Sequence, residues 1–358
     1  MENIYDVETS ISSIYPTGLP SITITDLRGT ISGEFVYDDV KLEQFYSPKF
    51  KFLMVNEDDF LDIADGMFGL NFENNSNQVV DNQNIISKLY YNNQIKKQIF
   101  TFNIKDEMRA SFSIGEMPKY IKNNKLNYST CKMRNGIGSI WNCYVTHILF
   151  DENYDFYNAI QLDNIIANFA TGFSNIYLPL KFLDLFMNNY FKTFPNYNKD
   201  SCIIKKFSKS KNILCQNTFL NTNGSSIHFI INGYAYKIPF DELFDDIFSD
   251  SYGTYKIFKI TFMDTPNNEW FLGTVFMKQY EMVFDAEKKV VGFYGGFKYD
   301  FTKLSNENIE EYCPYNTIVV IFLALLMIIP SIQTVIHNRV NMVKDTQFYL
   351  LSKGKISE

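Results

Sequence analysis

A series of short β-type runs through the first 300 residues constrains the fold more than any other feature of the sequence. The runs are rich in β-branched and aromatic residues, and Asn, Gly or Asp separates them. They are SITITDL (21–27), GEFVYDDVKL (33–42), QIFTFNI (98–104), IWNCYVTHILF (140–150), SIHFIINGYAYKIP (226–239), YKIFKITFM (255–263) and KKVVGFYGGF (288–297). Helical spacing is confined to short segments such as 82–91 and 178–191. The pattern predicts an all-β chain.

The composition excludes two classes of function. The formal net charge is -7 and no basic stripe runs through the 358 residues, which argues against a nucleic-acid partner. The three histidines, His147, His228 and His337, lie far apart, and together with the cysteines they make no metal-ligand spacing. We therefore expect neither a metal site nor a cofactor.

The cysteines leave the redox compartment open. They are Cys131, Cys143, Cys202, Cys215 and Cys313. Two pairs that close small loops, plus one cysteine beside an apolar segment, would fit an oxidising compartment, whereas five unrelated buried thiols are the alternative. Three N-x-S/T sequons, predicted glycosylation sites on a secreted face, are at Asn74, Asn127 and Asn223.

An uncharged apolar segment of 20 residues, TIVVIFLALLMIIPSIQTVI (317–336), is long enough to cross a bilayer as a helix. Pro330 would kink this helix, which membrane helices tolerate, and a buried core helix is the alternative. The basic residues that follow the segment favour a cytoplasmic C-terminus. They are Arg339, Lys344, Lys353 and Lys355. This orientation puts residues 1–316 in a lumen or outside the cell.

The N-terminus, MENIYDVETS, has neither the basic region nor the apolar region of a signal peptide. Two explanations fit this. Either the start is missing from the sequence, which we prefer, or the apolar segment inserts as a tail anchor and leaves the main domain in the cytosol.

The string WFLGTVFMKQYEMVFDAEKKVVGFYGG (270–296) carries the most specific motif of the chain. It resembles the C-terminal end of the pepsin-like aspartic proteases (peptidase family A1), which read W-x-L-G-x-x-F-x-x-x-Y-x-x-x-F-D…V-G-F. Other segments follow in the order of that family. They are the flap hairpin (22–42, with Gly29, Gly33 and Asp38 in register), DGMFGLNF (65–72), and FSIGEMPKY (112–120) with the Trp141 strand as the crossover between lobes.

The resemblance implies an all-β, bilobal pepsin-like acid protease fold, followed here by one C-terminal transmembrane helix. A shortened N-terminal lobe is expected over residues 1–118 and the C-terminal lobe over 119–300. A juxtamembrane linker (301–316), the transmembrane helix (317–336) and a cytoplasmic tail (337–358) complete the chain.

The family's chemistry needs two carboxylates, one from an Asp-Thr/Ser-Gly loop in each lobe, that share a proton. The ionised carboxylate activates a water molecule, and the other polarises the peptide carbonyl. An extended peptide pairs its backbone with the flap and the strands of the cleft. The disulfide usual in the C-terminal lobe implies a bond between Cys202 and Cys215.

The second of these loops aligns with NFATGFSNIYLP (168–179), which puts Ala170 on the family aspartate. Thr171, Gly172 and Ser174 remain, so a small turn at Thr171-Gly172 is expected without the carboxylate. Asp163 lies seven residues upstream, too far along the chain to take over.

The first loop aligns with YDVETSISSIYP (5–16), which keeps Asp6, Thr9 and Ser10 of the motif. Val7 and Glu8 replace its Thr and Gly, and an unrelated Asp6 is the alternative. At the flap tip Asp26 and Leu27 replace a Tyr-Gly pair. The predicted substrate-binding residues are Asp26, Gly29, Thr171, Gly172 and Ser174.

Departures at three separate elements favour a membrane-anchored pseudoprotease that binds an extended peptide or protein ligand in its cleft. The alternatives are an active aspartic endopeptidase, with a truncated N-terminus or a dyad completed by a second chain, and a mispredicted or non-functional gene product. The C-terminal anchor is similar to that of membrane-anchored protist members such as plasmepsin V. Ligand sequence and oligomeric state stay open.

Overall fold

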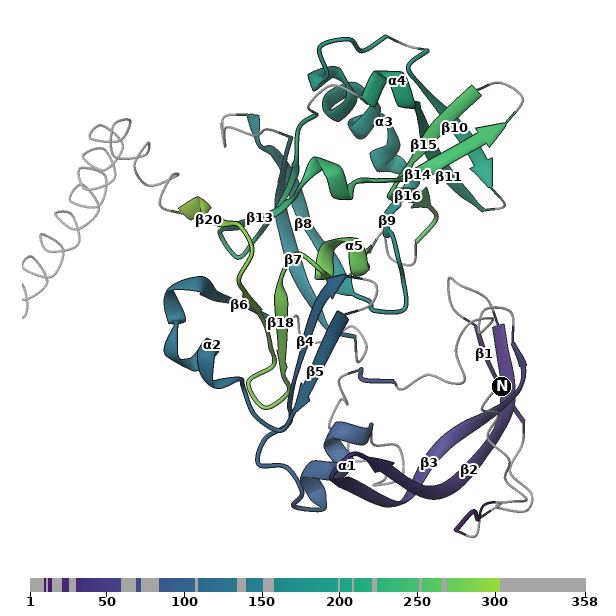
Figure 1. The fold of residues 1–358 in the computed structure, drawn as a ribbon, viewed down its shortest axis with the longest axis vertical. Helices are drawn as coiled ribbons and strands as arrows, with labels where there is room; N and C mark the ends of the chain where they lie inside the picture. The colour runs from purple at the N-terminus through teal and green to yellow at the C-terminus, as the bar shows by residue number, and fades with distance from the viewer. Residues whose placement is uncertain are drawn as a thin grey trace, which may run out of the picture. The chain divides into compact units, whose positions relative to one another are not determined.

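The computed structural model describes part of the chain. The described residues are 10, 12–14, 21–25, 30–58, 69–71, 84–106, 109–133, 140–150, 158–198, 200–207, 209–220, 224–250, 253–265 and 269–302. Residues Met1–Tyr299 form one compact unit and Asp300–Glu358 a second. Among the described residues of the first unit, short helices accompany three β-sheets (Figure 1).

The largest sheet has twelve strands. In spatial order they are β14 (Phe244–Asp250), β15 (Gly253–Phe258), β11 (Ser210–Gln216), β16 (Ile260–Met263), β9 (Ile176–Pro179), β17 (Trp270–Leu272), β8 (Ile160–Phe169), β7 (Asn142–Leu149), β12 (Ile227–Ile231), β13 (Tyr234–Ile238) and β20 (Lys298–Asp300), with β10 (Cys202–Phe207) paired to β11. The pairs β16–β9 and β17–β8 are parallel. Parallel pairs cannot form from adjacent hairpin strands, so this sheet depends on long-range pairing.

Two smaller sheets complete the β-structure. The five-stranded sheet has the order β5 (Arg109–Ile114), β4 (Ile99–Asp106), β18 (Glu281–Asp285), β19 (Val290–Tyr294) and β6 (Tyr128–Lys132). The three-stranded sheet consists of β1 (Ile22–Thr25), β2 (Thr30–Leu42) and β3 (Phe45–Asp58). Because β4 pairs with β18, the five-stranded sheet combines strands from both predicted lobes, and the boundary at residues 118 and 119 stays a prediction.

The helices within the described residues are short. They are α1 (Ile85–Tyr91), α2 (Lys119–Asn123), α3 (Leu183–Leu185), α4 (Asn217–Leu220) and α5 (Thr274–Met277), with the single turns η2 (Lys125–Asn127), η4 (Leu180–Phe182), η5 (Phe186–Tyr190), η6 (Phe191–Thr193) and η7 (Phe240–Glu242). The helix predicted within 82–91 is confirmed as α1, which starts where the Asn84 side chain accepts a hydrogen bond from the Ser87 amide.

The segment predicted as a helix over 178–191 instead divides into η4, α3, η5 and η6. Its apolar face is nevertheless buried, since Phe186 and Tyr190 are inaccessible to solvent. Tyr190 stacks on Phe258 of β15 with ring centroids 5.5 Å apart. Packing of these large rings therefore sets the path of the segment more strongly than helical propensity does.

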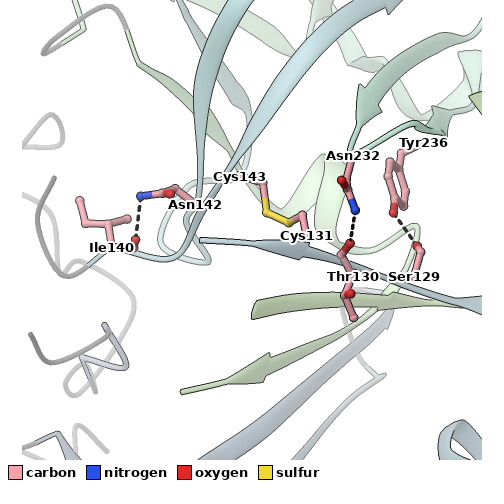
Figure 2. The surroundings of a disulfide bond; sticks show 8 residues. All are labelled: Ser129, Thr130, Cys131, Ile140, Asn142, Cys143, Asn232 and Tyr236. Carbon is pink, nitrogen blue, oxygen red and sulfur yellow. Dashed lines mark hydrogen bonds between the residues drawn. A yellow bond between two sulfur atoms is a disulfide. The ribbon is translucent and has the colours of Figure 1, made fainter. Parts of the chain in front are cut away.

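A disulfide between Cys131 and Cys143 joins β6 of the five-stranded sheet to β7 of the twelve-stranded sheet (Figure 2). Two hydrogen bonds connect neighbouring residues of the same two sheets. The Ser129 and Tyr236 hydroxyls lie 2.6 Å apart, and the Asn232 side-chain amide donates to the Thr130 carbonyl at 2.8 Å. The sheets are thus joined by one covalent bond and by polar contacts.

The second disulfide, Cys202–Cys215, confirms the predicted pair and links directly opposed residues of β10 and β11. Cys313, whose partner the sequence left open, lies outside the described residues. The predicted membrane span over 317–336 also lies outside them. Within the described part of the chain, no helix has the length and apolar character needed to span a bilayer.

Replacing both Cys131 and Cys143 with alanine is expected to lower the free energy of unfolding by about 3 kcal/mol, because the cross-link restricts the unfolded chain. Denaturant titration of both proteins under oxidising conditions measures the difference. Tyr236→Phe, which removes only the hydroxyl contact with Ser129, should cost about 1 kcal/mol. Equal stability of the double-alanine variant and the parent would show that this disulfide is dispensable.

Candidate active-site loop

The loop 170–175 connects two strands that are not neighbours in the sheet, because a third strand lies between them. It connects β8 to β9, and β17 lies between these strands in the sheet. Leu272 of β17 is opposite Phe169 on the parallel side and opposite Ile176 on the antiparallel side. Both ends of the loop are therefore fixed to the same central strand, which gives a short loop a defined position.

The loop itself is a tight turn. The Ala170 amide donates to the Leu272 carbonyl at 3.2 Å, and the Phe173 amide donates back to the Ala170 carbonyl at 3.2 Å. The second of these bonds closes a four-residue turn over Thr171 and Gly172, as the sequence predicted. Both turn residues are exposed, while Ala170 is half-buried.

The start of α5 supports the far side of the loop. The Thr274 and Val275 amides donate to the Phe173 and Ser174 carbonyls, at 2.8 and 3.2 Å. The Thr274 hydroxyl also donates to the Ser174 carbonyl, at 3.1 Å. These contacts satisfy amides at the start of α5 that have no partner within the helix. Gly273 permits them, because a Cβ at this position would lie under 3.0 Å from backbone oxygens of the loop.

The carboxylates nearest in the strand pairing do not reach position 170. Asp163 is exposed on β8, seven residues away, which corresponds to about 23 Å along an extended strand. The register that places Trp270 opposite Ala167 puts Glu269 four residues before Ala170, at about 13 Å along the strand. Neither side chain can substitute for a carboxylate at the loop.

Glu269 instead takes part in a buried polar pair that sequence analysis missed. It is 6% exposed, and its Oε2 accepts a hydrogen bond at 2.5 Å from the side-chain amide of Asn168, itself 1% exposed. Little in the sequence indicates that these two residues are buried, since a Glu before an apolar strand and an Asn before a loop are both common at surfaces. The pair fixes the strand that carries the loop to its neighbour β17.

Replacing Asn168 with leucine is expected to lower the free energy of unfolding by about 3 kcal/mol, because the buried Glu269 carboxylate loses its donor. Urea titration at neutral pH measures this. The double variant Asn168→Leu with Glu269→Leu should recover most of the loss, since no buried charge remains. If the double variant is as unstable as the single one, packing at position 168 accounts for the effect.

Aromatic side chains flank the loop. The Phe173 ring lies 4.8 Å from the Tyr177 ring and 5.7 Å from the Phe271 ring, measured between centroids. Burial raises the pKa of Tyr177, so its hydroxyl stays protonated and able to donate at neutral pH. An apolar surface with one hydroxyl suits an apolar side chain of a ligand better than a charged one.

Of the predicted first loop and flap, Asp6, Asp26 and Gly29 lie outside the described residues. Within the predicted first loop (5–16), the Ser10 hydroxyl donates to Asp38 Oδ2 at 2.6 Å and the Ser12 hydroxyl donates to Asp38 Oδ1. Asp38 lies on β2 and is 4% exposed. The family resemblance placed Asp38 in register, but its role in anchoring this segment was not predicted.

The structure describes one of the three predicted glycosylation sites. Asn127, one of the three sequon asparagines, is exposed in η2. Asn74 and Asn223 lie outside the described residues. Over the part of the chain that the structure describes, no group of three or more His, Cys, Asp or Glu residues could hold a metal ion.

A family model described as eukaryotic aspartyl protease matches residues 1–294. The chain belongs to this family. The prediction of a mostly-β, bilobal pepsin-like fold is thereby confirmed. The solved aspartic proteinase from Irpex lacteus agrees in fold, with a TM-score of 0.63 at 13% identity over 82% of this chain and 85% of that one.

Plasmepsins of Plasmodium falciparum are among the curated relatives. Plasmepsin IV is 27% identical over 310 residues, which cover 82% of this chain and 60% of that protein. Plasmepsin I is 24% identical over 309 residues, which cover 82% of this chain and 59% of that protein. The chain thus spans about 60% of the length of the curated relatives it matches. The similarity to plasmepsin V stays a prediction.

Proposed function

We propose that this chain is a membrane-anchored member of the aspartyl protease family that binds extended peptides in its cleft and has lost efficient peptide hydrolysis. One observation carries the proposal. The turn that starts at Ala170 has intact backbone hydrogen bonds, and the family resemblance assigns Ala170 to the position of the second family aspartate. A loop that keeps its conformation without its carboxylate is suited to recognition.

The chemistry explains why this substitution matters. Hydrolysis by the family needs one ionised carboxylate to activate water and one protonated carboxylate to polarise the peptide carbonyl. A methyl group at position 170 does neither. Asp6, the proposed first carboxylate, cannot perform both roles at once. Loss of one acid or base typically slows a reaction by about 10² to 10⁴.

The proposed peptide recognition depends on family features that this chain retains, namely the turn, the nearby hydroxyl and the proposed flap. The exposed turn at Thr171-Gly172 presents backbone groups to solvent, with the Ser174 hydroxyl nearby in sequence. Asp26 and Gly29 of the proposed flap are assigned to the opposite side of the ligand by the family resemblance. An extended peptide bound by main-chain hydrogen bonds needs no catalytic carboxylate.

The intact turn also favours a second candidate, an active aspartic endopeptidase. In that case a second chain supplies the missing carboxylate. The retained turn would then position a group that comes from elsewhere. Both candidates place an extended peptide in the same cleft and differ in turnover.

Membrane anchoring is part of the first proposal. It is supported by the uncharged segment 317–336 and by the basic residues after it, which favour a cytoplasmic C-terminus. The main domain is then lumenal or extracellular. Exposure of Asn127 in its sequon is compatible with that location.

Peptide cleavage by the purified full chain, from acidic to neutral pH and with or without pepstatin, tests the proposal. The expected result is no pepstatin-sensitive turnover, together with saturable binding of an extended peptide. Pepstatin-sensitive turnover would favour the second candidate and a carboxylate from elsewhere. Absence of both turnover and binding would leave no function in the cleft.

A further inference from the structure

Strand β10 (Cys202–Phe207) forms an unpaired edge of the twelve-stranded sheet. It pairs with β11 through six residue pairs, from Cys202 opposite Cys215 to Phe207 opposite Ser210. The other side of β11 is occupied by β15 and β16. Among the described strands, β10 has no second partner (Figure 1). Alternate backbone amides and carbonyls of such an edge point outward and are available to a further strand.

The edge carries apolar side chains that are open to solvent. Ile203 is 39% exposed, Ile204 47% and Phe207 37%. Because side chains alternate along a strand, Ile203 and Phe207 lie on one face and Ile204 on the other. Half of a six-residue edge strand is therefore exposed and apolar, which natural edges usually avoid.

The charge of the hairpin formed by β10 and β11 favours an acidic partner strand over a second copy of the same hairpin. Residues 201–216 contain four lysines and no acidic residue, in a chain whose net charge is -7. The lysines are Lys205, Lys206, Lys209 and Lys211. A second copy of the hairpin would bring a second set of four lysines beside the first, which is electrostatically unfavourable. An acidic strand would be attracted by the same charges, so the lysines disfavour self-pairing and favour an acidic partner.

The base of the hairpin is covalently fixed. The disulfide joins Cys202 to the directly opposed Cys215, at the end of the pairing away from the hairpin tip. A cross-linked hairpin loses little conformational freedom when another strand adds to it.

We propose that β10 is a docking edge for an acidic, extended segment of a partner protein, which adds to the sheet as a further strand. Main-chain hydrogen bonds would supply the pairing, Lys205 and Lys206 would contact carboxylates, and Ile203, Ile204 and Phe207 would pack against apolar side chains. A lipid surface fits this arrangement less well, because the two isoleucines lie near the disulfide and are not gathered at the hairpin tip.

Fluorescence anisotropy with the full chain and a labelled heptapeptide of alternating valine and glutamate tests the proposal. Saturable binding is expected, and the double variant Lys205→Glu with Lys206→Glu should weaken it by about tenfold or more. The matched control reverses another adjacent pair of exposed lysines, Lys96 and Lys97. It should leave the affinity unchanged within about twofold.

Three further probes separate strand pairing from other causes of binding. The same peptide with alternate amides N-methylated should not bind, because strand pairing needs those donors. Equal binding of the methylated peptide, or equal binding by the Lys205/Lys206 variant, would overturn the proposal. Pepstatin should not displace the peptide, whereas displacement would place it in the cleft. Binding to phosphatidylserine vesicles that depends on Lys205 and Lys206, without peptide binding, would replace the proposal with a membrane contact.

Discussion

Replacing Gly273 with alanine is expected to lower the free energy of unfolding by more than about 4 kcal/mol, a large part of the stability of an ordinary domain. The added Cβ would overlap the Phe173 and Asn175 carbonyl oxygens, which belong to the backbone of the loop 170–175. Backbone atoms cannot rotate away as side-chain atoms can. Relief requires the loop to separate from α5, which breaks the bonds from Thr274 and Val275.

Thermal unfolding followed by near-ultraviolet circular dichroism measures this effect. Gly69→Ala is the matched control, because Gly69 also follows an apolar pair, in DGMFGLNF, and a Cβ there would meet no atom within 4 Å. The thermal unfolding midpoint of the Gly69→Ala variant should differ from that of the parent by less than about 2 °C. Equal effects at the two positions would show that close approach to the loop does not explain the need for Gly273.

Local features of the sequence predicted individual turns and strands well. The turn at Thr171-Gly172 was predictable because turn chemistry depends on neighbouring residues alone. The strand predicted over 140–150 contains β7 (Asn142–Leu149), because its apolar and β-branched residues favour extended structure wherever it pairs. The Cys202–Cys215 bond followed from the family resemblance.

Long-range pairings could not be predicted in the same way. Nothing local in Cys131 and Cys143 shows that their strands belong to different sheets, and the sequence left their pairing open. The position of β17 between β8 and β9 likewise depends on parallel pairing across about 100 residues. Asn168 and Glu269 read separately as surface residues, and only this register makes them a buried pair.

Restoring both halves of the catalytic motif is expected to return peptide cleavage, whereas restoring one half is not. In the proposed alignment, Ala170→Asp alone supplies the second carboxylate, but Val7 and Glu8 still stand where the family has Thr and Gly in the first loop. A side chain at the glycine position should displace the turn that presents Asp6. We therefore expect no pepstatin-sensitive turnover from the single variant.

The triple variant Ala170→Asp, Val7→Thr and Glu8→Gly should cleave peptides at least about 10² times faster than the single variant, because both carboxylates are then presented. The matched control carries Ala170→Asn in the same background. Asparagine has the size of aspartate but cannot ionise, so this protein should stay inactive. Turnover by the asparagine control would remove position 170 from catalysis. Inactivity of the triple variant would mean that Asp6 is not the first carboxylate, or that Asp26 at the flap tip also blocks the reaction.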